Sequence, residues 1–342
     1  NVGVMIENIG VKVMQHINRA AVVNPVSLIA LVLLSTPKSA LDESLCLTQL
    51  ELYQRIAQAL PYDDDTHITS MPAADMLSYA KKLKLITHTS HILGDMVQIA
   101  DKQAPLLNYF KNNILHVFIL PSLVTAFVQR NGRVSRRELG EVVSLLYPFL
   151  QTELFLKYAL RNIHTVLDRT LSALIDTGVV VDMGNDIIAA PQSNTEAYQQ
   201  MTVLASPAQQ SLERYFMATT LLAEQGSGKL TREQAVNLCY LLGGRLSVLY
   251  ADDSPDLFDK ALFTSFINTL VRLEYVRVDE HSQALYFDER IHQIAHFARL
   301  VLTPDMMRLL HHITTLTEAE IAVISQDDTK KSFFESKKDP KQ

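Results

Sequence analysis

One histidine and three asparagines interrupt an otherwise apolar stretch, NYFKNNILHVFILPSL, at residues 108–123. On a continuous helix Asn108, Asn112 and His116 would share one face because they are four residues apart, with Asn113 beside them. A histidine in such an apolar site is a candidate general base. The alternatives are a membrane-spanning helix and a helix whose polar stripe makes contacts, either within this chain or with another domain.

Three further patterns approach known chemical motifs without completing them. His292 and His296 have the spacing of two metal ligands on a helix, but Gln293 stands where a zinc protease of this type has glutamate. The segment GSGK at residues 226–229 lacks the first glycine and the final serine or threonine of a phosphate-binding loop. The nucleophile motif G-x-S-x-G does not occur in the sequence. We therefore expect this chain to supply no catalytic residue, no metal site and no cofactor site.

The apolar runs of the chain are too short for a membrane-spanning helix. Such a helix needs about 20 mostly apolar residues, whereas the longest unbroken apolar run, residues 28–34, has seven. The run that contains His116 is interrupted at Pro121. The first thirty residues also lack the pattern of a secretory signal peptide.

Two clusters of basic residues are candidates for binding anions. The larger cluster comprises Arg130, Arg133, Arg136 and Arg137, and the smaller comprises Lys81, Lys82 and Lys84. Clusters of this kind usually lie on a solvated helix end, and they can also contact anionic lipid headgroups or an acidic partner protein.

The composition is that of a globular chain. Of the 342 residues, 48% are hydrophobic and 20% are charged, and the net charge of −6 gives no support for a nucleic-acid partner. The two cysteines, Cys46 and Cys239, favour a reducing compartment over a disulfide framework. The first residue is Asn1, which suggests a fragment of a longer protein.

Helical signals dominate the sequence. Residues 25–60 read as two helices around a break at Thr36-Pro37, and a helix is expected from Pro72 to Lys84. Capping boxes are expected at Ser135–Glu138 and Thr231–Gln234. Two prolines also predict helix boundaries. Pro148 should kink or break its helix, and Ser206-Pro207 should begin a helix.

Three segments change from a helical period to an alternating one, which predicts a helix followed by a β-hairpin. They are residues 77–100, 172–190 and 268–288, with turns near Gly94 and Gly184 in the first two. We predict a mostly α fold with small β-hairpins, namely a helical bundle plus winged-helix-like helix–hairpin units. Acidic residues in the helices before the hairpins argue against DNA binding, so these units favour protein interaction.

Several separated segments together resemble a known enzyme family. Four segments resemble, in the same order along the chain, the C-terminal region of bacterial membrane-associated glycerol-3-phosphate 1-O-acyltransferase. They are INRAAVVNPVSLIALVLLSTPKSALDE, NYFKNNILHVFILPSL, LYPFLQTELFLKY and RLSVLYADDSPDLFDKALFTSFINTLV. The resemblance extends from near residue 10 to about residue 300. It implies transfer of an acyl group from acyl-carrier protein or acyl-coenzyme A to the 1-position of glycerol 3-phosphate, the first step of phospholipid synthesis.

The same family carries its chemistry on a His-x-x-x-x-Asp box, and this chain lacks one. None of the eleven histidines is followed by aspartate five residues later; His91 and His164 have aspartate at four. The arginine-rich blocks that bind the substrate phosphate precede the matching region in the family. We therefore expect the chain to be the non-catalytic C-terminal part of the enzyme, inactive alone. The alternative is a stand-alone helical interaction or regulatory module, which a start codon immediately upstream of Asn1 would support.

The resemblance also implies partners and a location. The expected partners are the protein's own N-terminal catalytic domain and an anionic membrane surface, and the expected location is peripheral, on the cytoplasmic face of the bacterial inner membrane. From shifts in composition we predict four segments. They are an N-terminal helical segment (1–64), a segment with the polar stripe and the first clear winged-helix-like unit (65–192), a second helical, winged-helix-like unit (200–325) and a charged tail (326–342).

Overall fold

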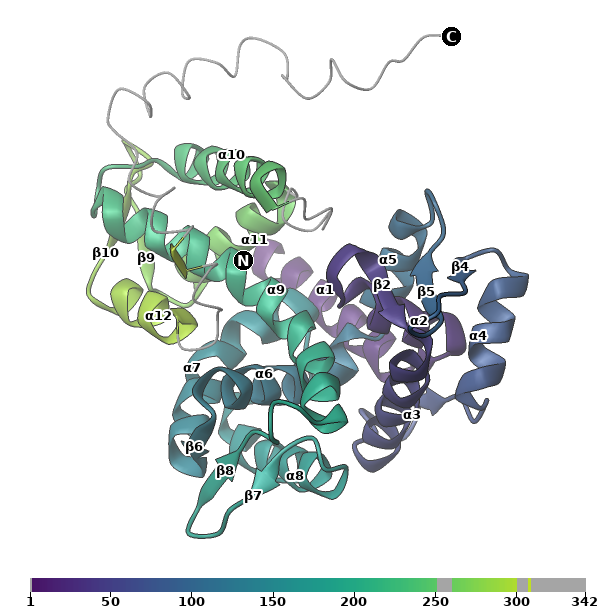
Figure 1. Cartoon of the computed structure of the whole chain (residues 1–342). Coiled ribbons are helices and arrows are strands. Elements are labelled where there is room, and N and C mark those ends of the chain that lie inside the picture. Colours follow the sequence, from purple (N-terminus) through teal and green to yellow (C-terminus); the bar gives the residue numbers. More distant parts are fainter. Residues whose placement is uncertain (1, 251–259, 300–306, 309–342) are drawn as a thin grey trace, which may run out of the picture. The chain divides into compact units, whose positions relative to one another are not determined.

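The computed structural model describes residues 2–250, 260–299 and 307–308, and these form two compact, mostly helical units (Figure 1). Among the described residues, the first unit contains 2–213 and 296–299, and the second contains 214–250, 260–295 and 307–308. The predicted charged tail, residues 326–342, lies outside the described residues.

The first unit begins with a helix, a short strand and a fully apolar helix: α1 (Val2–Arg19), β1 (Val22–Val23) and α2 (Pro25–Leu34). β1 pairs in parallel with β3 (His67–Ile68). Asn24 caps α2 by accepting a hydrogen bond from the Ser27 amide at 2.9 Å, and Pro25 occupies the first helical position. A helix that is apolar on all sides must be surrounded by protein, and residues 26–33 of α2 are all buried.

The first helix–hairpin unit begins with α2. Its further elements are η1 (Pro37–Ser39), β2 (Ala40–Asp42), α3 (Glu43–Ala59), α4 (Ala73–Lys82), β4 (Ile86–Thr89) and β5 (Met96–Ile99). The sheet has the order β2-β5-β4 and is antiparallel, with Val97 paired to both Leu41 and His88. The predicted break at Thr36-Pro37 and the predicted hairpin are therefore confirmed.

The second helix–hairpin unit repeats this arrangement. After α5 (Ala104–Asn112) it comprises α6 (Leu115–Asn131), β6 (Arg133–Ser135), α7 (Arg136–Leu154), η2 (Leu160–Asn162), α8 (Ile163–Asp176), β7 (Val181–Asp182) and β8 (Ile187–Ala189). Its sheet has the order β6-β8-β7, again antiparallel. The predicted capping box is present, because the side chains and amides of Ser135 and Glu138 bond reciprocally.

The second compact unit contains the third copy. Its elements are the end of α9 (Glu196–Gln225), α10 (Arg232–Tyr250), α11 (Lys260–Arg272), β9 (Val276–Val278), β10 (Leu285–Phe287) and α12 (Arg290–Arg299), whose last residues belong to the first unit. Thr231 forms a β-bridge to Ala284 beside β10, and its side chain forms the predicted capping box with Gln234. Tyr215 stacks on Phe266 inside this unit, with ring centroids 4.5 Å apart.

The three copies share one topology: helix, short strand or bridge, two helices, hairpin. In each copy the short strand pairs with the second strand of the hairpin and ends at the residue that caps the next helix, namely Asp42, Ser135 or Thr231. This is the winged-helix arrangement, and the predicted mostly α fold with small hairpins is confirmed. The short strands were not predicted, because two or three residues are too few to show an alternating pattern.

Both proline predictions need correction. α7 continues through Pro148 to Leu154, because Tyr147, Phe149 and Leu150 are buried on either side of the proline and hold the chain in the helix. Ser206 does not cap a helix, because α9 already begins at Glu196 and contains Pro207 in its interior. The hydroxyl of Ser122 lies beside this proline, accepting from the Ala208 amide at 2.8 Å and donating to the Ala205 carbonyl at 3.1 Å. The Ser122 side chain of α6 thus forms hydrogen bonds with an amide and a carbonyl of α9 on either side of the proline, which interrupts the regular hydrogen bonding of the helix.

Replacing Ser122 with alanine should destabilise the chain by about 1–3 kcal/mol, because the Ala208 amide would lose its partner in a buried site. Thr125→Val is the matched control: its hydroxyl is also buried in α6 but bonds only to carbonyls of its own helix. Urea unfolding of both variants measures the difference. Equal losses for the two would show that the Ser122 hydroxyl does not support the α9 backbone.

None of the described helices is by itself long and apolar enough to cross a membrane. α5 and α6 reach that length and apolarity only as a pair, and their axes differ by 86°. All residues of α6 from Leu115 to Val128 are buried within the protein.

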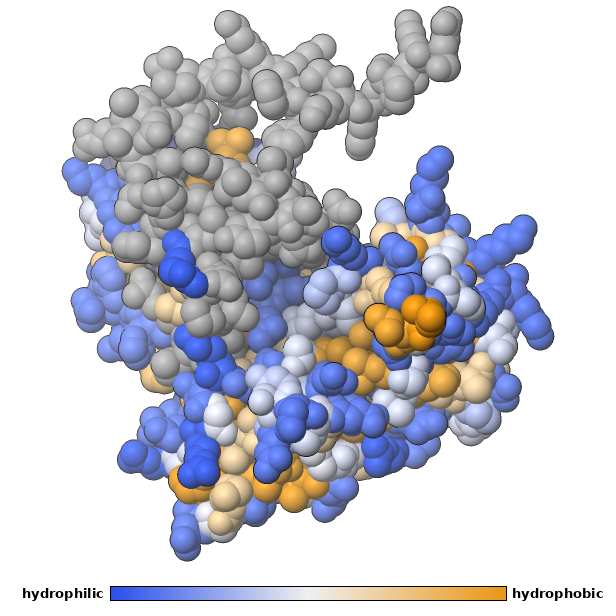
Figure 2. Space-filling model, viewed as in Figure 1, coloured by the Kyte–Doolittle hydropathy of each residue, from blue (hydrophilic) through white to orange (hydrophobic). Residues whose placement is uncertain are grey.

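Apolar side chains remain at parts of the surface of the first unit, as the face in Figure 2 shows among largely hydrophilic residues. Ile92 and Leu93, at the turn between β4 and β5, are 96% and 87% exposed. A second set lies along α1.

Candidate functional site

The polar stripe of residues 108–116 does not lie on one helix. α5 ends at Asn112, Asn113 is its C-terminal cap, and α6 starts at Leu115 after a bend of 86°. Asn108 is half-buried, and both Asn112 and Asn113 are exposed. The prediction of a continuous helix is therefore wrong: the chain turns at Asn113-Ile114, and the turn buries Ile114 and the apolar residues that follow it.

His116 lies in the first turn of α6 and is 5% exposed. Its Nε2 is 2.9 Å from the backbone carbonyl oxygen of Asn18, near the end of α1. The ring of Tyr62 packs edge-on against the imidazole, with centroids 4.7 Å apart and an interplanar angle of 83°. His116 therefore joins the start of α6, the end of α1 and the segment after α3.

The surroundings of His116 keep its imidazole neutral. Burial lowers its pKa to about 4, and the hydrogen bond to the Asn18 carbonyl opposes this only partly. Because a carbonyl can only accept, Nε2 must carry the proton and donate it. A base with this pKa and with this nitrogen already bonded is poorly suited to take a proton from a substrate hydroxyl at neutral pH.

The end of α1 has two further attachments, one to the last residue of α7 and one to the loop that follows it. Asn18 Nδ2 donates to the Leu154 carbonyl at 2.7 Å, and Gln15 Nε2 donates to the Leu156 carbonyl at 3.2 Å. The chain presents these carbonyls because Phe155, in the left-handed region with φ 52°, ends α7. The last turn of α1 is therefore held by side chains from its own helix and from α6.

Lys157 connects this loop to the segment after α3. Its amide donates to the Tyr62 hydroxyl at 2.8 Å, and its ammonium lies 2.7 Å from Asp63 and 4.9 Å from the centroid of the Tyr62 ring. The hydrogen bond from Lys157 holds the pKa of the Asp63 carboxyl below its usual value. Arg19, at the end of α1, lies 3.6 Å from the same carboxylate.

We call this set of residues the polar junction. Its members are Asn18, Arg19, Tyr62, Asp63, His116, Lys157 and Tyr158. It ties together four segments of the first unit that are far apart in the sequence: the end of α1, the residues after α3, the start of α6 and the loop after α7.

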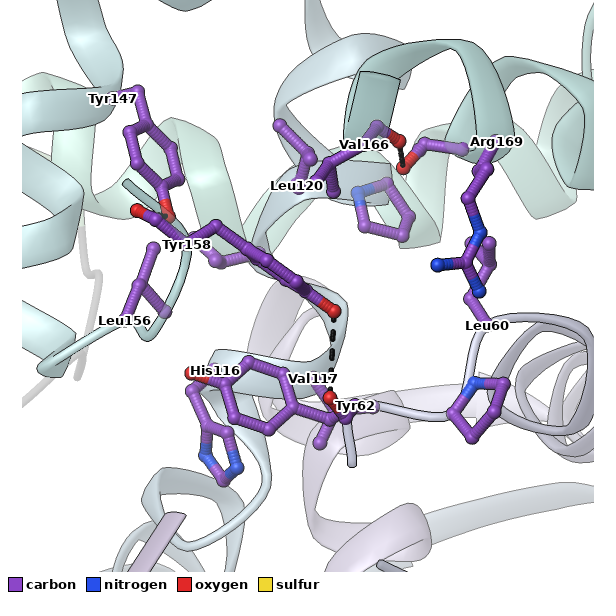
Figure 3. Close-up of a pocket in the computed structure, with 14 residues that line it drawn as sticks. Leu60, Tyr62, His116, Val117, Leu120, Tyr147, Leu156, Tyr158, Val166 and Arg169 are labelled. Atoms are coloured by element: carbon purple, nitrogen blue, oxygen red, sulfur yellow. Dashed lines mark hydrogen bonds between the residues drawn. The ribbon is translucent and has the colours of Figure 1, made fainter. Parts of the chain in front are cut away.

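A small, mainly apolar cavity of about 40 Å³ adjoins the polar junction (Figure 3). Tyr62, His116 and Tyr158 line one part of it, and Arg169 of α8 lines another, with aliphatic residues between them. The Tyr158 hydroxyl points to the Tyr62 carbonyl at 3.4 Å. Burial raises the pKa of the Tyr62 hydroxyl to about 12, so the Tyr62 hydroxyl stays protonated at neutral pH. The volume has room for only a few water molecules, far less than a pocket for an acyl chain.

The basic cluster at the β6–α7 corner is partly neutralised by the hairpin that follows. Arg136 lies 3.0 Å from Asp182 and 3.7 Å from Asp186, so it closes the β7–β8 turn onto α7. Arg137 is 81% exposed at its side chain, and 3.9 Å separates it from Glu141. Arg133 is exposed and Arg130 is half-buried. Arg133 and Arg137 are thus the members of this cluster that are best placed to meet an external anion.

Sequence reasoning missed one group with ligand-type side chains. His88 Nε2 lies 2.6 Å from Glu43 Oε2 and 3.1 Å from Asp95 Oδ2. Glu43 and His88 are more than forty positions apart along the chain. Only the pairing of β2, β4 and β5 brings the three residues together. In the structure this contact closes the first hairpin onto the start of α3. His292 and His296 are both exposed on α12, and within the described part of the chain they belong to no such group.

Fold and site together define a tandem array of winged-helix-like units, whose first two copies are joined to α1 by a polar junction. The chain belongs to the family described as the glycerol-3-phosphate acyltransferase C-terminal region, which matches residues 2–279. This finding confirms the resemblance seen in the sequence.

Curated relatives in three Pseudomonas species are named glycerol-3-phosphate acyltransferase. The chain is 36% identical to the protein of Pseudomonas paraeruginosa over 317 residues, which cover 92% of this chain and 38% of that protein. It is 34% identical to the Pseudomonas fluorescens protein over 319 residues, with the same coverage, and 36% identical to the Pseudomonas putida protein over 298 residues. The chain therefore spans somewhat more than a third of the length of these relatives.

Proposed function

We propose that this chain is the non-catalytic C-terminal part of a glycerol-3-phosphate 1-O-acyltransferase and that it supports the preceding catalytic domain. The parent enzyme would transfer an acyl group from acyl-carrier protein or acyl-coenzyme A to the 1-position of glycerol 3-phosphate, in phospholipid synthesis. The family match and the relatives' names support the parent activity.

The state of His116 is the observation that carries the non-catalytic role. Acyl transfer to a hydroxyl needs a base that can take the hydroxyl proton. His116, the one buried histidine among the described residues, has its Nε2 bonded to a backbone carbonyl and a pKa of about 4. No histidine in the sequence has aspartate five residues later. The polar junction is therefore suited to holding segments together, and the proton transfer is assigned to the preceding part of the protein.

Restoration of activity in trans tests this role. The full-length enzyme, a version that ends where this chain begins, and that version mixed with this chain are assayed for acylation of glycerol 3-phosphate. We expect the shortened enzyme to lose most activity and the mixture to regain a measurable part. Full activity of the shortened enzyme alone would contradict a supporting role.

We further propose that the parent enzyme is peripheral, on the cytoplasmic face of the bacterial inner membrane, and that Arg133 and Arg137 contribute to attraction by anionic lipids. Attraction of this type is screened by salt. Reversing both charges with Arg133→Glu and Arg137→Glu should weaken binding of the chain to anionic vesicles several-fold in a flotation assay at low salt.

Lys38→Glu and Arg55→Glu provide a matched control for this experiment, because both residues are exposed in the first compact unit and belong to neither basic cluster. Arg136 is left unchanged because its ion pair with Asp182 is structural. Equal binding of the unmodified chain to neutral and anionic vesicles would refute the electrostatic contribution.

A further inference from the structure

Helix α1 exposes one continuous apolar face. Met5, Ile6, Ile9, Val13 and Ile17 are between 50% and 63% exposed. At 100° per residue these five side chains fall within about one third of the helix circumference. They form what we call the α1 apolar face.

The opposite side of α1 is the side that contacts the first unit. Gln15 and Asn18, which donate hydrogen bonds to the end of α7 and the loop after it, lie there, and Val11 between them on the helix surface is half-buried. A surface helix normally turns its apolar side to the core and its polar side to water. α1 does the reverse, so its apolar face is directed away from the unit to which its last turn is attached.

The charges of α1 fit a protein partner better than a lipid surface. Helices that lie in a membrane interface carry many lysines and arginines on the polar face. α1 has only Lys12 and Arg19 against Glu7, and Arg19 is already engaged with Asp63. Electrostatic attraction to anionic lipid would therefore be weak at this helix.

The length of the relatives identifies the partner. The chain covers 38% of the Pseudomonas paraeruginosa protein, and the family match, which is to a C-terminal region, begins at residue 2 within α1. The remaining length of such a protein lies mainly before α1, so the helix stands between the two parts. We propose that the α1 apolar face packs against the N-terminal catalytic domain of the same polypeptide and that the polar junction fixes the angle at which α1 presents this face.

This inference rests on the proposed function, and the experiment separates the two. In the full-length enzyme, Ile9→Asp with Val13→Asp introduces two charges into the α1 apolar face. Asn8→Asp with Lys12→Asp introduces two aspartates at exposed polar positions of the same helix outside the α1 apolar face and serves as the matched control. We expect the first pair to lower activity at least tenfold and the second pair to change it less than twofold.

Hydrogen exchange provides a readout of contact that is independent of activity. In the full-length enzyme the α1 amides should exchange at least tenfold more slowly than in the isolated chain, and Ile9→Asp with Val13→Asp should abolish the difference. In the isolated chain neither pair should change the melting temperature of the rest of the fold. Equal exchange of α1 in the full-length enzyme and the isolated chain would overturn the proposal.

Other partners of the face give distinct results. A membrane would be the partner of the face if Ile9→Asp with Val13→Asp abolished vesicle binding but retained activity and α1 protection in detergent. That result would exclude the catalytic domain as the partner. A dimer of the isolated chain that this pair dissociates would assign the face to a second copy. If the shortened enzyme is fully active without this chain, the proposed function fails. If the unmodified chain and the Ile9→Asp, Val13→Asp chain restore activity in trans equally, only the α1 inference fails.

Discussion

Replacing His116 with leucine should lower the free energy of unfolding of this chain by about 1–3 kcal/mol at pH 7. Leucine fills a similar volume but cannot donate to the Asn18 carbonyl, which lies 2.9 Å from Nε2. The variant also loses the edge-on contact with Tyr62. Because Asn18 belongs to the last turn of α1, we expect this helix to loosen first.

Asn112→Leu is the matched control, because Asn112 was assigned to the same polar stripe but is exposed at the end of α5. Its replacement should change stability by less than about 0.5 kcal/mol. The chain has no tryptophan, so urea unfolding is followed by circular dichroism and tyrosine fluorescence. Equal effects of the two substitutions, or an unchanged midpoint for His116→Leu, would contradict the structural role of His116.

Acidification from pH 6.5 to pH 4 should remove roughly 3 kcal/mol of stability through His116 alone. The pKa of the imidazole is about 4 in the folded chain and 6.5 without the protein environment. Between these values the unfolded chain binds a proton at His116 that the folded chain does not, so protons favour unfolding as the pH falls. This contribution is fully present above pH 6.5 and is lost by pH 4.

Comparison with His116→Leu separates the pH-dependent contribution of His116 to the free energy of unfolding from the contributions of the other titrating groups. The charged groups of the polar junction are Arg19, Asp63 and Lys157, and both proteins contain them. The leucine variant should have a flatter stability profile between pH 6.5 and pH 4, so its deficit at neutral pH should shrink or reverse. Parallel profiles for the two proteins would show that His116 is not kept neutral by burial.

The elements governed by local sequence could be predicted. Capping residues such as Ser135 and Thr231, and the change from helical to alternating period before each hairpin, act over a few residues and are visible in the sequence. These signals were enough to predict the mostly α fold and the three helix–hairpin segments.

Features that depend on distant contacts could not be predicted. Pro207 is tolerated inside α9 because Ser122, more than eighty residues earlier, bonds to the backbone beside it. The turn between α5 and α6 contains neither proline nor glycine, and packing of Ile114 and the following apolar residues decides it. Local propensity is overruled by tertiary packing at both places.

The candidate site shows the same division. The sequence singled out His116 because a histidine in an apolar run is unusual. It could not indicate the partner, because Asn18 is 98 positions away. Lys157 and Tyr62 gave no signal at all, since a lysine after a helix and a tyrosine before an acidic run are common on ordinary surfaces.

The central claim, that this chain lacks the catalytic machinery, is tested most directly by an acylation assay of the purified 342-residue chain. Labelled glycerol 3-phosphate is supplied with acyl-carrier-protein and coenzyme A thioesters, and the full-length enzyme at equal molar concentration serves as the reference. We expect the chain to give no product above a blank without protein while the full-length enzyme turns over. Steady product formation by the chain alone, abolished by heating it, would contradict the assignment of the chemistry to the preceding domain.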